Sequence, residues 1–130
     1  MANTFFQFKK FIVHQAHTSM KVCTDACLFG AWAASDPQVM NAHKILDIGA
    51  GTGLLSLLIA QANNNATITA VEIEPAAANE ATSNFKLSPW PDHLNLVHDD
   101  IRNFGNHANN LYNVIITNPP FYEGDLKSPD

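Results

Sequence analysis

The sequence lacks the features that mark secreted and membrane-spanning proteins. It contains two cysteines, too few for a disulfide framework, and this indicates a reducing compartment such as the cytoplasm. Its longest apolar run, from Leu54 to Ala62, includes Ser56 and is too short to cross a bilayer. The first residues show neither the charged region nor the cleavage pattern of a signal peptide. We therefore expect a cytoplasmic protein without a membrane partner.

Positive charge is also scarce. Arg102 is the only arginine, and the formal net charge of −5 counts against a nucleic-acid partner. The distribution qualifies this, because three lysines and no acid precede Asp25. These lysines are explained equally well as ordinary surface residues or as an arm that contacts phosphate groups: Lys9, Lys10 and Lys21.

Metal ligands at a useful spacing are missing too. His14 and His17 lie three residues apart and Cys23 and Cys27 four apart, but no second ligand pair at zinc spacing accompanies them. We therefore predict no metal site. The cysteines are better explained as small residues buried at the start of a helix.

From Lys44 onward, short apolar segments that favour strands alternate with segments that favour helices. The expected strands cover residues 44–48, 66–72, 95–98 and 112–116, and the expected helices cover 54–62 and 76–87. This alternation predicts an α/β fold with a Rossmann-like, doubly wound parallel sheet. Between a helix and a strand, Asn63-Asn64-Asn65 is expected to be a solvated loop.

The residues before Lys44 are expected to form a smaller part of the fold. Residues 5–13 are typical of a strand or short hairpin. Residues 26–34 favour a helix that Thr24 or Asp25 caps and that Ser35-Asp36-Pro37 ends. We therefore divide the chain into residues 1–43, with the hairpin and helix, and residues 44–130, with the sheet.

The first candidate site lies where the first strand of the sheet meets its helix. Residues 47–53 read Asp-Ile-Gly-Ala-Gly-Thr-Gly, and glycines there permit a tight turn and a close approach of a ligand to the backbone. The dinucleotide-binding pattern G-x-G-x-x-G would need a glycine where the chain has Leu54. This spacing argues against nicotinamide and flavin cofactors. An ordinary tight connection between strand and helix is the alternative.

Acidic residues end the neighbouring strands. Asp47, Glu72 and the pair Asp99-Asp100 should converge, because ligands of open α/β sheets bind at the carboxyl ends of strands. Convergent carboxylates suit S-adenosyl-L-methionine, which has ribose hydroxyls, an adenine amine, and ammonium and sulfonium charges. We assign Glu72 to the ribose and favour Asp100 over Asp99 for the adenine amine. The alternative for Glu72 is an ordinary solvated acid at a strand end.

The second candidate site follows the last strand. The chain reads Asn118-Pro119-Pro120-Phe121 there, and a strand inside a sheet has no use for two prolines. Their stiffness suits a loop in which the Asn118 side chain and the Pro119 carbonyl accept the two hydrogens of a substrate –NH2 group. Phe121 would supply a face on which a base stacks. A turn that closes the strand is the alternative.

Together the two motifs carry a resemblance to a known family. D-I-G-A-G-T-G followed by N-P-P-F is similar to class I S-adenosylmethionine-dependent amino methyltransferases. Residues 6–11, 20–25 and 28–33, with Ser88-Pro89-Trp90 and residues 126–130, narrow the resemblance to the bacterial tRNA1(Val) (adenine(37)-N6)-methyltransferase family. The resemblance extends from about residue 5 to residue 130.

This resemblance implies N6-methylation of adenosine 37 in valine tRNA, with S-adenosyl-L-methionine as cofactor and the anticodon loop of the tRNA as partner. It implies a catalytic loop formed by Asn118, Pro119, Pro120 and Phe121. It also implies a cofactor site formed by the following residues: Thr24, Asp47, Gly49, Ala50, Gly51, Gly53, Glu72, Ile73, Asp100, Ile101 and Asn118.

The residues leave other functions open. A methyltransferase with the same motifs could act on guanine N2 of ribosomal RNA or on a protein glutamine, and the chain could also be a domain that binds the cofactor without activity. The family fold has seven strands in a chain about twice as long, so we expect a truncated chain. The last strand, Val114-Ile115-Ile116, would then be an exposed apolar edge through which the chain self-associates.

Overall fold

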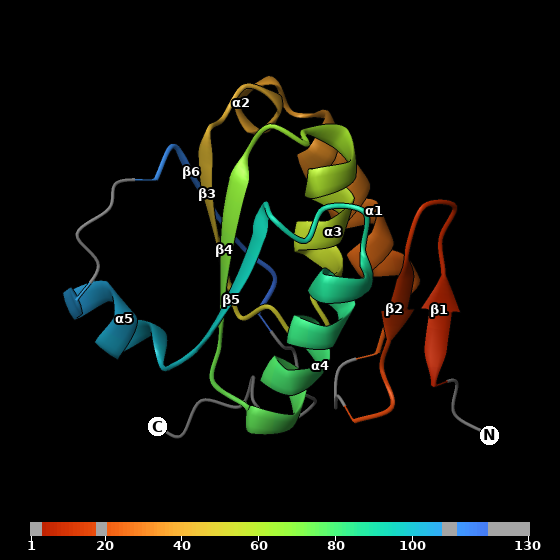
Figure 1. Cartoon of the computed structure of the whole chain (residues 1–130). Helices are drawn as coiled ribbons and strands as arrows, with labels where there is room; N and C mark the ends of the chain where they lie inside the picture. The colour runs from red at the N-terminus through yellow and green to blue at the C-terminus, as the bar shows by residue number, and fades with distance from the viewer. Residues whose placement is uncertain (1–3, 18–20, 108–111, 120–130) are drawn as a thin grey trace, which may run out of the picture.

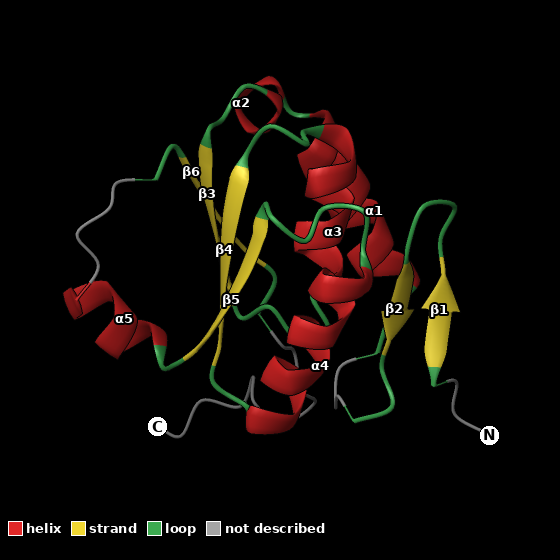
Figure 2. Ribbon diagram, viewed as in Figure 1, coloured by secondary structure: helices red, strands yellow, loops and turns green. Residues whose placement is uncertain are grey.

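The computed structural model describes residues 4–17, 21–107 and 112–119 (Figure 1). A sheet of four parallel strands has the order β5-β4-β3-β6. Its strands are β3 (Lys44–Ile48), β4 (Thr67–Glu72), β5 (Leu94–His98) and β6 (Val114–Thr117). Figure 2 shows helices α1 (Thr24–Ser35), α3 (Leu54–Ala62) and α4 (Pro75–Leu87) on one face, and α5 (Ile101–His107) on the other side. The predicted Rossmann-like parallel sheet is confirmed.

The hydrophobic core lies between this sheet and its helices. Leu57 and Ile59 of α3 have no exposed surface (0%). They belong to the same buried cluster as Ile45 and Ile68, which occupy paired positions on β3 and β4. A helix that is apolar on nearly every side has to be buried in this way. Because α3 follows β3 directly, its burial holds the connection between them at the carboxyl end of the sheet.

A separate antiparallel hairpin, formed by β1 (Phe5–Gln7) and β2 (Ile12–His14), packs beside α4 (Figure 1). Val13 of β2 is fully buried, and the Phe11 ring meets the Trp90 ring edge-on, with 5.9 Å between their centroids. Trp90 follows α4 in the chain, so the hairpin and the end of α4 bury each other's aromatic rings. The predicted hairpin is confirmed, whereas the division of the chain after residue 43 stays a prediction.

Helix starts differ from the sequence prediction. The residue that caps α1 is Cys23, which makes no side-chain capping bond, so the prediction of Thr24 or Asp25 as the cap was wrong. Cys23 is exposed, contrary to the prediction of buried cysteines, whereas Cys27 is half-buried against the hydrophobic core. Asp36 ends α1 as predicted but also begins α2 (Pro37–Met40), because its carboxylate accepts the Gln38 N–H at 2.8 Å. Pro37 suits the first position of α2, where a helix has no use for its missing N–H. Helix α5 is not predicted by the sequence pattern.

The three asparagines after α3 differ in environment. Asn63 is buried, and its side-chain Nδ2 donates to the carbonyls of Val39 at 2.9 Å and Ala42 at 3.0 Å. Asn64 and Asn65 are exposed. The prediction of a solvated loop is therefore wrong for Asn63, whose amide joins the end of α3 to α2 and to the segment that follows α2.

We expect Asn63→Ala to lower the free energy of unfolding by about 1–3 kcal/mol, because two buried carbonyls lose their donor. Urea denaturation followed by circular dichroism measures this loss. Asn64→Ala, at the exposed neighbouring position, is the matched control and should change the free energy of unfolding by less than about 0.5 kcal/mol. Equal effects of the two substitutions would contradict the structural role of Asn63.

Candidate functional site

The turn between β3 and α3, residues 49–53, contains three glycines with positive φ: +75° at Gly49, +56° at Gly51 and +90° at Gly53. A Cβ atom at Gly49 or Gly51 would meet nothing within 4 Å, so the backbone there faces open space. A Cβ atom at Gly53 would instead lie 2.6 Å from Cε1 of Phe85, so Gly53 is where α4 packs closely against the turn. The turn therefore offers an open backbone on one side and is packed on the other.

Glu72, at the end of β4, reaches this turn with its side chain. The Gly51 N–H donates to its Oε1 at 2.7 Å, and the Glu74 N–H donates to its Oε2 at 3.0 Å. The residue is buried. A carboxylate oxygen can accept more than one hydrogen bond, so Glu72 can still accept bonds from a ligand. This contact places the Glu72 carboxylate against the glycine turn.

Asp47 lies beneath the turn rather than on its open side. It is only 1% exposed, and the Ser56 hydroxyl of α3 donates to its Oδ2 at 2.7 Å. The pKa of Asp47 is raised to about 6, chiefly by burial and also by the nearby Glu72 carboxylate, while the bonds from Ser56 oppose the shift. Asp47 thus ties the end of β3 to the first turn of α3.

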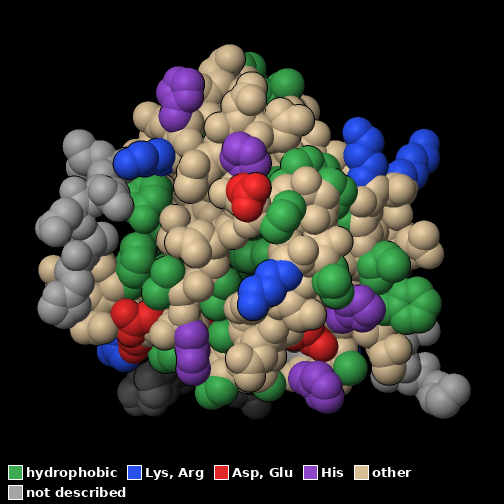
Figure 3. All heavy atoms as spheres, in the orientation of Figure 1, with side chains coloured by type: hydrophobic (Ala, Val, Ile, Leu, Met, Phe, Trp, Pro, Cys, Tyr) green, Lys and Arg blue, Asp and Glu red, His purple; other side chains and the backbone are tan. Residues whose placement is uncertain are grey.

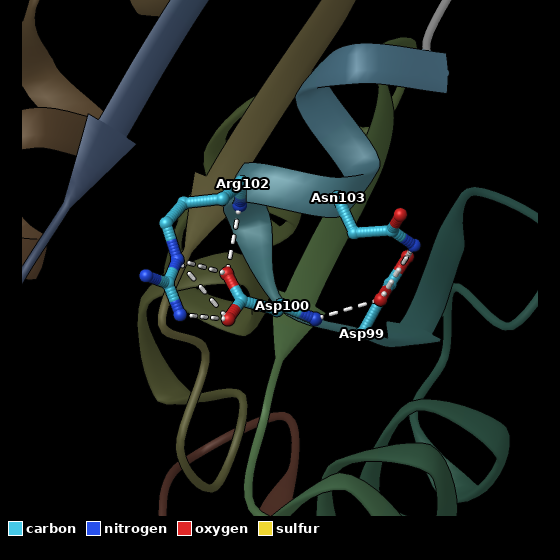
Figure 4. Close-up of polar contacts among 4 residues, drawn as sticks. All are labelled: Asp99, Asp100, Arg102 and Asn103. Atoms are coloured by element: carbon cyan, nitrogen blue, oxygen red, sulfur yellow. Dashed lines mark hydrogen bonds and ion pairs between the residues drawn. The ribbon is translucent and has the colours of Figure 1, made fainter.

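Asp99 and Asp100 lie between β5 and α5, and both accept bonds from α5 (Figure 4). Oδ2 of Asp100 pairs with Nη2 of Arg102 at 2.7 Å, and its Oδ1 accepts the Arg102 N–H at 2.8 Å. These bonds lower the pKa of Asp100 to about 2. Asp99 accepts from Nδ2 of Asn103 at 2.9 Å, and its own N–H donates to the Glu72 carbonyl at 3.0 Å. The backbone of Asp99 therefore brings both acids beside the end of β4.

The second motif begins beside the first. Strand β6 pairs with β3, so that Thr117 lies opposite Ile48, and the Thr117 hydroxyl donates to the Ile48 carbonyl at 2.9 Å. Asn118 and Pro119 follow directly and are exposed. Pro120 and Phe121 lie outside the described residues. The start of the motif and the glycine turn thus leave the sheet from neighbouring strands, at the same end.

The remaining predicted site residues take different positions. Thr24 is exposed in the first turn of α1, and Ile73 is exposed directly after β4. Ala50 is buried within the glycine turn, and Ile101 is half-buried at the start of α5. Ile73 follows Glu72 and Ile101 follows Asp100 in the chain.

Residues that the sequence motifs do not indicate support the turn. Ser56 donates a hydrogen bond to Asp47, and Asn84 donates one to the Thr52 carbonyl. The Phe85 ring packs against Gly53. Ser56 is a polar residue among apolar neighbours in α3, and this sequence signal could have identified it, although not the group that it binds. Asn84 follows Thr82 and Ser83 in the more polar helix α4, so its neighbours give no such signal.

The surface carries no concentrated positive charge on the face drawn in Figure 3, where Lys and Arg side chains are spread among His and acidic ones. Lys9 and Lys10 lie in the turn between β1 and β2. Nζ of Lys21 donates to the Gln15 carbonyl. Among the described residues, no helix is long and apolar enough to cross a membrane. In the same part of the chain, no three His, Cys, Asp or Glu side chains are grouped so as to hold a metal ion.

Comparison with protein families and curated proteins gives consistent matches. Residues 34–130 match the family model described as "Methyltransferase small domain". The chain is 51% identical over 127 residues to the tRNA1(Val) (adenine(37)-N6)-methyltransferase of Dyadobacter fermentans. This alignment covers 98% of this chain and 50% of that protein. The protein of the same name from Cytophaga hutchinsonii is 46% identical, over 98% of this chain and 52% of that protein. The chain spans about half the length of the curated relatives it matches.

Solved structures show the same fold at low sequence identity. P. horikoshii TYW2 in complex with MeSAdo superposes with a TM-score of 0.66 at 20% identity, over 77% of this chain and 37% of that one. The O-methyltransferase from Bacillus cereus in complex with SAH gives 0.64 at 17% identity, over 78% of this chain and 47% of that one.

The raised pKa of Asp47 predicts a pH dependence of stability. Because this pKa rises from 3.8 to about 6 on folding, the folded state binds the proton more tightly than the unfolded one. The resulting stabilisation is present below pH 4 and is lost as the pH rises through 6. Relative to Asp47→Asn, which cannot ionise but can still accept the Ser56 bond, the wild-type protein should lose about 2 kcal/mol of unfolding free energy between pH 4 and pH 7.

Urea denaturation of both proteins at pH 4, 5, 6 and 7 measures this difference. The comparison with Asp47→Asn cancels the contributions of titrating groups that do not interact with Asp47. A difference between the two proteins that stays constant with pH would show that Asp47 does not titrate in this range.

Proposed function

Since this chain belongs to the methyltransferase small domain family, we propose that the protein transfers a methyl group from S-adenosyl-L-methionine to N6 of adenosine 37 in a valine tRNA. The observation that carries the proposal is the similarity to proteins named for this activity, which extends over almost the whole chain. The family membership alone supports methyl transfer. The names of the relatives are the reason for proposing adenine in tRNA as the substrate.

The cofactor fits the residues around the glycine turn. The open space above Gly49 and Gly51 leaves room for a ligand against the backbone, and buried carboxylates favour a ligand with positive charge. When bound, S-adenosyl-L-methionine supplies a methyl group on a positively charged sulfur. The proposed cofactor residues are those of the turn and of the adjoining strand ends: Thr24, Asp47, Gly49, Ala50, Gly51, Gly53, Glu72, Ile73, Asp100, Ile101 and Asn118.

Within this set, Glu72 and Asp100 have separate roles in the proposal. Glu72 accepts bonds from the ribose hydroxyls, since its Oε1 already lies at the glycine turn, where it accepts the Gly51 N–H, while its Oε2 accepts the Glu74 N–H. Asp100 accepts from the adenine amine once Arg102 releases one of its oxygens. Arg102 is 87% exposed, and exposed ion pairs of this kind are weak and easily exchanged.

The loop after β6 would hold the target adenine. Oδ1 of Asn118 and the carbonyl of Pro119 accept the two hydrogens of the exocyclic amine, which directs the nitrogen lone pair toward the methyl group. Pro119 and Pro120 stiffen the loop, and Phe121 stacks on the base. Positioning and electrostatics carry most of the rate in such a transfer, because the product ammonium loses its proton afterwards and no strong base is needed.

The proposed partner is the anticodon loop of the tRNA in the cytoplasm. Bases of a single-stranded loop can be presented to a small enzyme without opening a duplex. Lys9 and Lys10 are the proposed phosphate contacts on the described surface, whereas the Lys21 ammonium already bonds the Gln15 carbonyl.

Incubation with tritiated S-adenosyl-L-methionine and separate pools of tRNA, ribosomal RNA and protein tests the proposal. We expect label in tRNA alone, as N6-methyladenine at position 37 of valine tRNA. Asn118→Ala should reduce transfer by at least about 100-fold, since it removes an acceptor used at the reacting amine. Its cofactor affinity should stay within a few-fold of the wild-type value.

Asn64→Ala is the matched control, because Asn64 is exposed in the loop before β4, away from the carboxyl ends of the strands. Label in ribosomal RNA or in protein alone would replace the proposed substrate by guanine N2 or by glutamine. Loss of cofactor binding in Asn118→Ala would mean that the amine-binding site is misplaced.

We also propose that this chain self-associates through β6. This strand ends the order β5-β4-β3-β6, and Ile115 is 61% exposed on it. An apolar edge strand is a template for pairing with another chain. Light scattering at tens of micromolar should give a mass above that of the monomer, and Ile115→Lys should restore the monomer. A wild-type monomer with intact circular dichroism would contradict the proposal.

A further inference from the structure

One buried side chain, Asn84 of α4, connects the glycine turn to the N-terminal hairpin. It is 1% exposed. Its Nδ2 donates to the Thr52 carbonyl in the turn at 2.8 Å and to the His14 carbonyl on β2 at 3.0 Å. Its Oδ1 accepts the His14 N–H at 2.9 Å. A single amide thus holds three backbone groups from two segments that are far apart in the chain.

The pattern of these bonds requires an amide. An asparagine side chain has two donor hydrogens on one atom and an acceptor on the other, and here both hydrogens and the acceptor are used. An aspartate could accept the His14 N–H but would turn an oxygen toward two carbonyl oxygens. An alanine would leave all three backbone groups without their partner, and buried polar groups are costly in that state.

Neighbouring residues of α4 make the same connection. Phe85 packs against the turn at Gly53. One turn of helix earlier, the Glu80 carboxylate accepts the His17 N–H, with 3.2 Å to Oε2 and 3.3 Å to Oε1. Helix α4 therefore binds the turn with one part of its surface and the end of the hairpin with the next.

We propose that Asn84 is a positioning residue of the cofactor site and that it couples the hairpin to the occupancy of that site. By fixing the Thr52 carbonyl, it holds the turn in the conformation that leaves Gly49 and Gly51 open. Through its two bonds to His14, the same amide also holds β2 against α4. The inference rests on the proposed function, because it takes the glycine turn to be the place where the cofactor binds.

The coupling follows from thermodynamic linkage. A ligand that binds only the ordered turn also stabilises the contacts that keep the turn ordered, and the bond from Asn84 is one of them. Opening of β2 away from α4 breaks both bonds between His14 and Asn84 and frees the amide to leave Thr52. Ligand binding should therefore make this opening rarer, although no ligand atom needs to touch β2.

Hydrogen exchange of the His14 amide, followed by NMR, measures the coupling directly. Saturating S-adenosylhomocysteine should slow exchange at this amide by about tenfold, within the usual range of coupling between sites. The control is the Ala42 amide, which bonds the Val39 carbonyl at 3.2 Å in the segment after α2 and should respond less. Unchanged exchange at His14 while S-adenosylhomocysteine binds would overturn the inference.

Substitution of Asn84 tests the positioning role. Asn84→Asp and Asn84→Ala should weaken S-adenosylhomocysteine binding by about tenfold in calorimetry, the effect of losing a buried hydrogen bond. In Asn84→Asp the ligand should no longer slow exchange at His14. Asn79→Ala, at an exposed position of the same helix, is the matched control and should bind as the wild type does.

The outcomes separate the two proposals. If the wild-type protein does not bind S-adenosylhomocysteine, the proposed function fails and this inference fails with it. If the wild type binds and both Asn84 variants bind equally well, only the inference fails. Thermal melting shows whether each variant is folded, and where Asn84→Asp or Asn84→Ala is unfolded, the exchange of the wild-type His14 amide decides alone.

Discussion

The glycine turn between β3 and α3 has no side chains of its own with which to keep its shape at Gly49, Gly51 and Gly53. It is held from outside: the Val71 carbonyl accepts the N–H groups of Gly49 and Ala50, and Glu72 accepts that of Gly51. Behind the turn, Asn84 binds the Thr52 carbonyl. These hydrogen-bond partners lie in β4 and α4, which follow α3 in the chain. The remaining packing serves to bring those elements against β3.

The same arrangement concentrates negative charge at the end of the sheet. Asp47 is buried below the turn, and Glu72 is buried beside it. Burial raises the pKa of Asp47 to about 6, so this carboxylate loses its charge below that pH. A positively charged ligand above the turn favours the ionised carboxylates. Under the proposed function, the acids at this end of the sheet would serve the cationic cofactor rather than the RNA.

Prediction from sequence succeeded where the signal is local. The alternation of segments that favour strands and helices predicted the strands and the main helices. The glycines at positions 49, 51 and 53 predicted a turn that a ligand can approach closely. It failed at Asn63, because three identical residues in a row give no sign that only the first meets two buried carbonyls. It also failed at the start of α1, where both Thr24 and Asp25 are suitable caps by type and Cys23 takes the position.

The sequence by itself determined the α/β class, the place of the glycine turn and the acid Glu72 at the end of the next strand. These depend on residue periodicity and on backbone sterics, which act over a few positions. The tertiary structure alone decided that Asp47 is buried under the turn, that Glu72 binds Gly51, and that Asn84 joins the turn to the hairpin. Glu72 and Gly51 are 21 positions apart, and Asn84 lies 32 positions from Thr52 and 70 from His14. Such pairs meet only when the parallel sheet and α4 have formed, and no local pattern selects them.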